Sequence, residues 1–241
     1  MILFVNGDSH AAAAEAVNPH AWAQDDELYW ALGQRPHPDN ERVSFGCELA
    51  NSLNAVLECA AQSGSSNARI MRTTKQWLKS QTDIQNLFVV IQWSTWERQE
   101  WFMDGTWWQV NASGVDHVPP DLQSRYRRFV SEIDWHHCRQ QAHDEIWSFH
   151  QELQAQKIRH VMFNGNNHFG DITSRRDWGA RYMHPYLGEK TLDSVLKNHG
   201  FQTVNANSWH FGPDAHCFWA DYLLQYMIDN QLLDANEIPT Y

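Results

Sequence analysis

The first ten residues constrain the fold of this chain more than any other stretch. They read Met-Ile-Leu-Phe-Val-Asn-Gly-Asp-Ser-His, and the four consecutive apolar residues at positions 2–5 are typical of a buried strand in a parallel sheet. Asn6 and Gly7 end that strand, and the alanine-rich residues 11–17 favour a helix. Ser9 is therefore expected in a turn between a strand and a helix, at the sheet edge where such folds bind ligands.

This position of Ser9 allows two interpretations. A nucleophilic serine at the start of a helix would have unpaired backbone N–H groups beside it, which form a ready-made oxyanion site. Asp8 and Ser9 are also good helix N-cap residues, and a cap requires no chemistry. These ten residues alone favour the cap, so the choice depends on the rest of the chain.

The rest of the chain alternates between short apolar runs and amphipathic segments. Further strands are expected at residues 55–60, 87–91, 159–163 and 201–204. Helices are expected from Ser44, near 25–32, at 67–79, at 120–153 with a bend or break near Asp134, at 191–198 and at 216–230. This order predicts a single domain over residues 1–241, an α/β fold with a parallel sheet, helices on both faces and right-handed crossovers.

The composition argues against several classes of protein. A formal net charge of −11 argues against nucleic acid as a partner, because neutralising phosphates requires clustered Lys and Arg. No apolar run reaches the ~18 residues of a membrane span, and the N-terminal run is too short for a signal peptide. The four cysteines lack the spacing of a zinc site or disulfide framework, so we expect reduced thiols in the cytoplasm.

Tryptophan is unusually frequent, with 13 in the chain. Five of them fall in residues 93–108, inside an expected insertion over about 93–120 in which residues 107–110 are extended. Tryptophans in a loop can form a stacking platform for sugars or bases. More often they are large apolar plugs whose N–H finds a backbone carbonyl, and we favour that interpretation here.

A second stretch that can carry chemistry precedes the last expected helix and reads Trp209-His-Phe-Gly-Pro-Asp-Ala-His216. Histidine is the usual base for a weakly nucleophilic serine, and a carboxylate can orient its ring. In an extended segment residues i and i+2 face the same side, so Asp214 and His216 could be neighbours. The alternative is that Asp214 caps the last helix and His216 lies in its first turn.

Taken together, these motifs resemble those of the SGNH (GDSL) hydrolase superfamily. The resemblance rests on Gly7-Asp8-Ser9 after the first strand, Gly64 after the second, and Asp-x-His before the last helix. Within that superfamily the chain looks closest to SGNH-like proteins of tailed phages, which have a Gly-x-Ser-Asn loop and a Trp-Ser/Thr-x-x-Arg-x-Glu stretch. The corresponding stretches here are residues 64–67 and, approximately, 93–100.

The resemblance implies a flavodoxin-like three-layer α/β/α fold with a five-stranded parallel sheet, and ester hydrolysis through an acyl-serine. It implies that Ser9 is the nucleophile, His216 the base and Asp214 its orienting acid. The backbone N–H groups of Ser9 and Gly64 would be the oxyanion donors. No metal or other cofactor is implied.

The chain departs from the superfamily pattern in two places. Gln-Trp-Ser-Thr stands at 92–95 instead of the Gly-x-Asn-Asp block, whose asparagine is an oxyanion donor, and the closing motif has one residue between acid and base rather than two. The side-chain amide of Asn67 or that of Asn164 is a candidate replacement for the missing donor. Losing one such donor typically costs ~10²–10³ in rate, so a true enzyme of this type could be slow.

The substrate expected from these features is a small-molecule or glycan ester, in particular an O-acylated glycan. The residues assigned to substrate binding are His10, Trp93, Trp96 and Trp209. One alternative is a binding or structural module that kept the fold and lost efficient catalysis, such as a glycan-binding or particle component of a phage. A weaker one is acyl transfer to a sugar hydroxyl. A phage-encoded protein would work in the host cytoplasm, and the oligomeric state is left open.

Two further groups of polar residues are interpreted as surface features. His136, His143 and His150 are seven positions apart and line one helical face. Histidines two turns apart are separated by about 10 Å, which is too far for both to bind one metal ion. We therefore interpret these histidines as a solvated face of the helix. Glu97, Arg98 and Glu100 are expected to form an exposed ion-pair cluster, with the steering of a charged substrate as the alternative.

Overall fold

The central element of the protein is a five-stranded sheet in the order β2-β1-β3-β6-β7, in which every neighbouring pair is parallel. The computed structural model describes residues 1–21, 36–112 and 119–238, so the helix expected near 25–32 lies outside the described residues. The strands of this sheet are β1 (Ile2–Asn6), β2 (Val56–Cys59), β3 (Leu87–Trp93), β6 (His160–Asn164) and β7 (Tyr182–Met183). In chain order this is 2-1-3-4-5, the strand order of flavodoxin-like folds.

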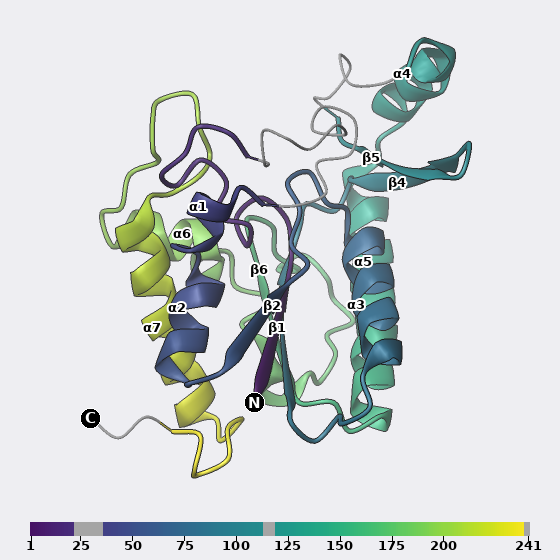
Figure 1. Cartoon of the computed structure of the whole chain (residues 1–241). Coiled ribbons are helices and arrows are strands. Elements are labelled where there is room, and N and C mark those ends of the chain that lie inside the picture. Colours follow the sequence, from purple (N-terminus) through teal and green to yellow (C-terminus); the bar gives the residue numbers. More distant parts are fainter. Residues whose placement is uncertain (22–35, 113–118, 239–241) are drawn as a thin grey trace.

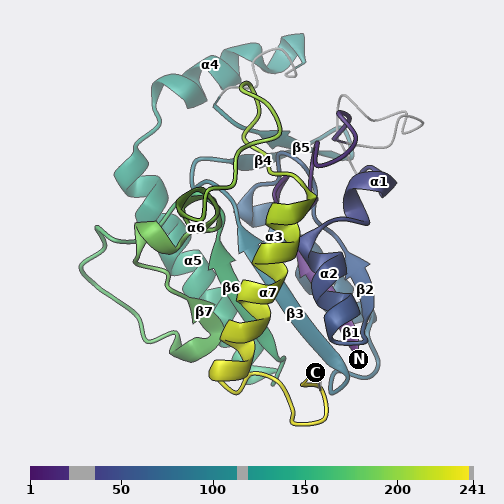
Figure 2. The same ribbon diagram turned by 90° about the vertical axis from the view of Figure 1, so that its left-hand side faces the viewer.

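Helices cover both faces of the sheet and make three layers (Figure 1). One face carries α2 (Phe45–Ser52), α6 (Leu192–Asn198) and α7 (Pro213–Asp229), and the other carries α3 (Asn67–Ser80) and α5 (Trp135–Ala155). Successive residues of a strand point to opposite faces, so Leu3 and Val5 join the core under α7 while Phe4 joins the core under α5. The turned view of Figure 2 shows α7 running across the sheet. The expected three-layer α/β/α class is confirmed.

The four longest parallel strands were predicted at nearly their observed positions, but the fifth was not. Residues 201–204 form only one isolated bridge, from Thr203 to Phe211. The fifth strand is instead β7, whose two residues pair with β6 in the register Met162↔Tyr182. A strand of two residues is too short to carry an apolar pattern, and β7 occupies the place beside β6 that residues 201–204 were expected to take.

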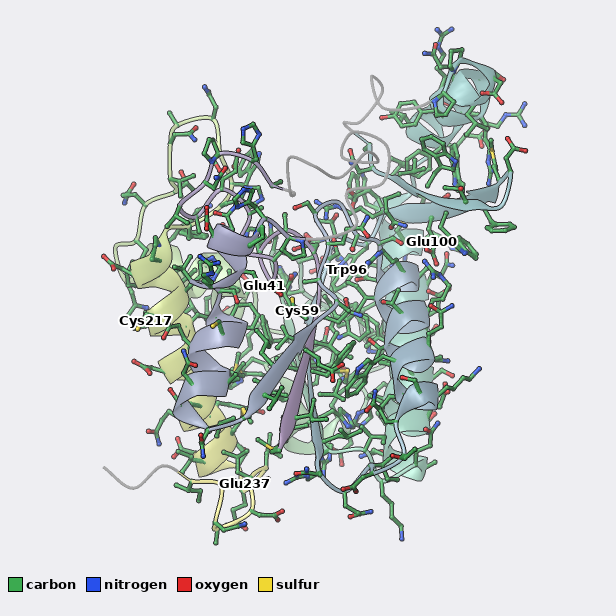
Figure 3. The ribbon with its side chains drawn as sticks, in the orientation of Figure 1. Glu41, Cys59, Trp96, Glu100, Cys217 and Glu237 are labelled. Carbon is green, nitrogen blue, oxygen red and sulfur yellow. The ribbon has the colours of Figure 1, made fainter. Side chains whose placement is uncertain are left out.

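The Trp-rich insertion contains an antiparallel hairpin of β4 (Gln99–Met103) and β5 (Thr106–Val110), in which Trp101 pairs with Trp108. The extended piece expected at 107–110 is therefore confirmed, while β4 was not expected. Glu100 accepts from Nη2 of Arg72 on α3 at 2.8 Å, which ties the hairpin to the body of the protein. Figure 3 shows Glu100 where the hairpin leaves that body.

The long helical region is two helices, α4 (Gln123–Ser131) and α5. They are separated at the predicted position, because the Asp134 carboxylate accepts from the N–H of His137 at 3.0 Å and caps α5. The shorter helix α1 (Pro38–Glu41) precedes α2, and Ser44 caps α2 in the same way. Of the helices described, none has both the length and the apolar character that a membrane crossing needs.

The histidine face of α5 is not solvated, which corrects the expectation for two of its three members. His136 is exposed, but His143 and His150 are fully buried. Nδ1 of His150 and Nε2 of His160 are 2.9 Å apart, and Nδ1 of His160 lies 2.8 Å from the carbonyl oxygen of Ile158. His160 therefore donates through Nδ1 and accepts from His150 through Nε2, so both rings are neutral.

Acid should destabilise the protein through this buried pair. Burial, with Arg181 nearby, lowers the pKa of His150 to about 4 and that of His160 to about 3, whereas both groups have a pKa near 6.5 when unfolded. The unfolded chain therefore binds more protons below pH 6.5, and each ring costs about 1.4 kcal/mol of stability per pH unit down to its folded pKa.

We expect the double variant His150→Leu/His160→Leu to show a shallower fall in the free energy of unfolding between pH 6 and pH 5 than the wild type. The difference in slope should correspond to roughly two protons. Urea unfolding at several pH values measures it, and the exposed His136→Leu on the same helix is the control. Equal slopes in the wild type and double variant would contradict a neutral buried pair.

Candidate active site

The loop after β1 lies at the carboxyl edge of the sheet, as expected for Ser9. Asp8, Ser9 and His10 are all buried, with Ser9 only 8% exposed. Figure 1 shows this loop (purple) beside the segment that leads into α7 (yellow-green). The stretches that the sequence singled out at the two ends of the chain therefore meet at one edge.

The alanine-rich run is a chain of turns rather than the expected helix over 11–17. The N–H of Ala12 does reach the carbonyl of Asp8, at 3.0 Å, as in a helix. Ala13 and Glu15 then adopt φ values of 49° and 62°, in the left-handed region that interrupts a right-handed helix. The residues of this run that face inward are small enough to be buried in a tight loop, so tertiary packing overrides the helix propensity of alanine.

Asp8 forms a buried ion pair with Arg98. Its Oδ2 accepts from Nη1 of Arg98 at 3.1 Å and from the hydroxyl of Ser94 at 2.8 Å, and its Oδ1 accepts from the N–H of His10 at 3.0 Å. Burial raises the pKa of Asp8, but the Arg98 guanidinium and these hydrogen bonds outweigh it, so the net pKa is lowered. Asp8 is therefore a carboxylate that holds the loop in shape.

This arrangement corrects the expected exposed cluster of Glu97, Arg98 and Glu100. Arg98 turns inward to Asp8, Glu100 pairs with Arg72, and Glu97 is only 8% exposed. The sequence showed the charges but not their partners, because Arg98 and Asp8 lie 90 positions apart.

Gln92 joins the ends of three strands. Its Oε1 accepts from the N–H of Asp8 at 3.1 Å, and its Nε2 donates to the carbonyl of Trp93 at 2.7 Å. A Cβ on Gly7 would lie 2.8 Å from Oε1 of Gln92, and a Cβ on Gly165 would collide with its Nε2. Glycine is therefore required after β1 and after β6, because this amide occupies the space between them.

Ser9 and Gly64 present unpaired donors at this edge. Within the part of the chain that the structure describes, neither the hydroxyl nor the backbone N–H of Ser9 has a hydrogen-bond partner, and the N–H of Gly64 has none either. The N–H of Gln62 donates to the carbonyl of Gly7 at 3.2 Å, so the Gly64 turn lies against the Ser9 loop. Gly64 has a φ of +80°, which glycine adopts without strain.

The two asparagines considered as further oxyanion donors are engaged elsewhere. Asn67 donates to the carbonyl of Ser94 at 3.3 Å and accepts from its N–H at 2.9 Å. The amide of Asn164 donates to the carbonyl of Pro185 at 3.3 Å and accepts from the Tyr182 hydroxyl at 2.5 Å. Both side chains therefore fix neighbouring loops.

Asp214 and His216 are not paired, because α7 begins earlier than expected. The helix starts at Pro213, and residues i and i+2 of a helix do not face each other. Asp214 is exposed, whereas His216 is 5% exposed and its Nδ1 accepts from the N–H of Phe45 at 3.3 Å. The extended geometry expected for this segment is thus corrected to the first turn of a helix.

A pair that sequence reasoning missed lies close by, between Glu15 and His210. Oε2 of Glu15 is 2.6 Å from Nδ1 of His210, and it also accepts from the hydroxyl of Ser208 at 2.6 Å. Burial raises the pKa of Glu15, but the hydrogen bonds from Ser208 and His210 outweigh it, so the net pKa is lowered. The ring of His10 packs against that of His210 with centroids 5.5 Å apart.

The aromatic residues assigned to substrate binding differ in exposure. Trp93 is completely buried and packs edge-on against Phe149, so it has no surface for a ligand and that expectation is corrected. Trp96 is 8% exposed, stacks on Phe169 and lines a cavity of about 270 Å³ beneath the hairpin (Figure 3). Trp209 is 70% exposed beside His210. Trp93 and Trp96 are therefore buried apolar plugs, but the expected hydrogen bond of the indole N–H is absent for both among the described residues. Trp209 is free to stack on a ligand.

The fold and the loop at the end of β1 define an α/β protein of flavodoxin-like topology with a polar, partly unpaired edge. A family model described as a family of unknown function, DUF6071, matches residues 33–163, more than half of the chain. The chain therefore belongs to that family. A comparison with curated proteins gave no match.

Several solved structures are similar to the chain in overall course. A lipolytic protein of the G-D-S-L family from Desulfitobacterium hafniense DCB-2 is 10% identical with a TM-score of 0.45, over 96% of this chain and 99% of that one. An acetyl xylan esterase from Butyrivibrio proteoclasticus is 12% identical with a TM-score of 0.48, over 95% and 64%. A family two carbohydrate esterase from Clostridium thermocellum is 16% identical with a TM-score of 0.38, over 96% and 65%.

A likeness of this degree concerns the path of the chain and says nothing of activity. The closeness to phage proteins stays a prediction.

Proposed function

We propose that the protein is a serine esterase that acts through an acyl-enzyme on Ser9. The observation that supports this best is the set of unpaired donors at the end of β1. The hydroxyl and N–H of Ser9 and the N–H of Gly64 have no partner among the described residues, and their loops are joined through Gln62 and Gly7. Donors without a protein partner at the ligand-binding edge of a parallel sheet are free to bind an oxyanion.

The proposed reaction has two steps. The Ser9 oxygen attacks the ester carbonyl, its proton passes to a base, and the N–H groups of Ser9 and Gly64 stabilise the oxyanion. The tetrahedral intermediate expels the alcohol, which takes up the proton and leaves an acyl group on Ser9. Water then attacks this acyl group in the same way, which releases the acid and restores the serine.

We propose O-acylated glycans as the substrate class. Trp209 supports this, because it is the large aromatic side chain most exposed among the described residues and immediately precedes His210. An exposed indole offers an apolar face with a polar edge, which suits the face of a sugar ring. Trp209→Ala should therefore weaken turnover of acetylated xylo-oligosaccharides more than that of p-nitrophenyl acetate.

A fluorophosphonate probe tests the nucleophile directly. We expect one adduct per chain by intact mass, located on Ser9 by peptide mapping, because the probe phosphonylates an activated serine and displaces fluoride. Ser9→Ala should give no adduct while unfolding at the same temperature as the wild type. An adduct that persists in Ser9→Ala, or maps to another residue, would reject Ser9.

A second candidate function is a glycan-binding module with little catalysis. The engagement of the Asn67, Asn164 and Gln92 amides favours it, because none of these side chains is free to act as a third oxyanion donor. A missing donor costs ~10²–10³ in rate. A glycan array at neutral pH separates the two functions, since a binding module would bind the acetylated glycans on the array and leave their acetyl groups in place.

A further inference from the structure

Three imidazoles gather at the edge that carries Ser9, from His10, His210 and His216. We infer that His210, oriented by the carboxylate of Glu15, is the general base of the site, in place of the Asp-x-His pair before α7. This inference rests on the proposed esterase function and specifies which residues move the proton. The inference follows from the hydrogen bonds that the ring nitrogens of these three histidines already make.

His216 is unsuited to the task in this arrangement. A neutral imidazole has one acceptor nitrogen, and Nδ1 of His216 uses it to accept from the N–H of Phe45. Nε2 must then carry the hydrogen, so it cannot take one from a serine. Burial, with His10 and His210 nearby, also lowers the pKa of His216 to about 3, which makes it a weak base.

His10 lacks an orienting acid on its ring. The Asp8 carboxylate next to it accepts from the backbone N–H of His10, and its other oxygen is taken by Arg98 and Ser94. Burial lowers the pKa of His10 to about 4 despite the charge of Asp8. The ring of His10 instead packs at 66° to that of His210.

His210 has the arrangement that the others lack. The carboxylate of Glu15 accepts from Nδ1 at 2.6 Å, which fixes the tautomer with a free lone pair on Nε2 and stabilises the imidazolium that forms during reaction. Glu15 is held in turn by Ser208, whose hydroxyl also accepts from the backbone N–H of His210 at 3.0 Å.

The same loop carries the nucleophile and the orienting acid. The N–H of Ala14 donates to the carbonyl of Ser9 at 2.9 Å, so Glu15 follows directly on the turn that Ser9 begins. Glu15 keeps a left-handed φ of 62°, a strained conformation for a residue other than glycine, and such strain is concentrated at functional sites. The Ser9 hydroxyl has no hydrogen-bond partner among the described residues, and in free enzymes the contact between a catalytic serine and its base is often long and shortens when substrate binds.

The proton balance is as follows. As the Ser9 oxygen bonds to the acyl carbon, its proton moves to Nε2 of His210, and the positive ring is balanced by Glu15. When the carbon–oxygen bond to the alcohol breaks, that proton passes to the leaving oxygen. In the second step water loses a proton to Nε2, and Ser9 recovers it when the acid leaves.

Steady-state hydrolysis of p-nitrophenyl acetate by three variants tests the inference. His210→Gln should lower kcat/KM by ~10²–10⁴-fold, at least tenfold more than His216→Gln does. Glu15→Gln should lower kcat and leave KM nearly unchanged, because the imidazole loses the acceptor that orients it while the contacts to substrate remain. The exposed His136→Gln is the control for a surface histidine.

The outcomes separate this inference from the esterase proposal. If Ser9→Ala abolishes turnover but His216→Gln costs more than His210→Gln, the proposed function stands and His210 is rejected. A wild-type kcat in Glu15→Gln, or a loss confined to KM, likewise rejects the orienting role, because the base would then work without the Glu15 carboxylate. Thermal unfolding shows whether each variant is folded. If His210→Gln or Glu15→Gln fails to fold, His210→Asn or Glu15→Asp takes its place.

Discussion

Replacement of Ser9 by alanine is expected to lower kcat/KM for p-nitrophenyl acetate by ~10³-fold or more. Without the hydroxyl no acyl-enzyme forms, and only the donors of the Ser9 and Gly64 backbone remain to stabilise a direct attack by water. The hydroxyl has no hydrogen-bond partner in the described chain, so its removal should leave the free energy of unfolding within about 0.5 kcal/mol of the wild type.

A matched control is Ser63→Ala, in the neighbouring loop. The Ser63 hydroxyl also has no partner, but it is not part of the proposed site, so its loss should leave kcat/KM nearly unchanged. Progress curves with both variants at equal concentration make the comparison. Turnover by Ser9→Ala within tenfold of the wild type would refute the acyl-serine pathway.

The largest effect on stability is expected from Arg98→Met. The Asp8 side chain is 3% exposed, and Arg98 is the cation that faces it. Removing that cation leaves a buried carboxylate uncompensated, which costs about 3–5 kcal/mol. Arg42→Met is the control, because its partner Asp39 is half exposed and such pairs contribute about 1 kcal/mol or less.

The pH dependence identifies the cause of that loss. In the wild type the pKa of Asp8 is lowered, so its contribution to stability is present at neutral pH and is lost as the pH falls through the folded pKa. In Arg98→Met, burial still raises the pKa of Asp8 and only His10 and Ser94 remain to lower it, so its folded pKa is higher than in the wild type. The deficit should therefore be greatest at neutral pH and should shrink as the pH falls.

Urea unfolding at pH 7 and pH 4.5 measures the deficit, and Asp8→Asn/Arg98→Met should recover part of it. A deficit independent of pH would point to lost packing instead.

Strands β1, β3 and β6 could be predicted because they are buried on both faces. Such strands are continuous apolar runs, and β1, β3 and β6 lie within a few residues of their expected bounds. Helix starts could also be predicted where a short polar side chain accepts a hydrogen bond from a backbone N–H of the first turn, as Ser44 does for α2 and Asp134 for α5. In both cases a local interaction decides the structure, so a local pattern reveals it.

The features that escaped prediction depend on distant partners. The alanine run has the propensity of a helix, but the left-handed Ala13 and Glu15 interrupt it in the folded chain. Arg98 and Glu97 look like surface charges until Asp8 and the hairpin are in place. Strand β7 is defined by its neighbour β6 and not by its own two residues.

The two stretches that form the candidate site were chosen from the sequence, one near each end of the chain. The pairing of an acid with a histidine between them was not predicted. Pro213 is a common first helical residue, and that signal could have placed Asp214 and His216 inside a helix, where they diverge. Glu15 had no such signal, because a single acid within an alanine run is typical of any amphipathic helix. Its partner His210 is 195 positions away.

This separation has a consequence for how activity arises during synthesis. The serine proposed as nucleophile is synthesised with the first strand of the sheet, whereas the imidazole proposed to deprotonate it follows only after all five strands. A nascent or prematurely ended chain can hold Ser9 in a nearly finished scaffold and still be inert towards esters. Ester cleavage would therefore report that the segment carrying His210 has docked, which makes it a readout for a late stage of folding.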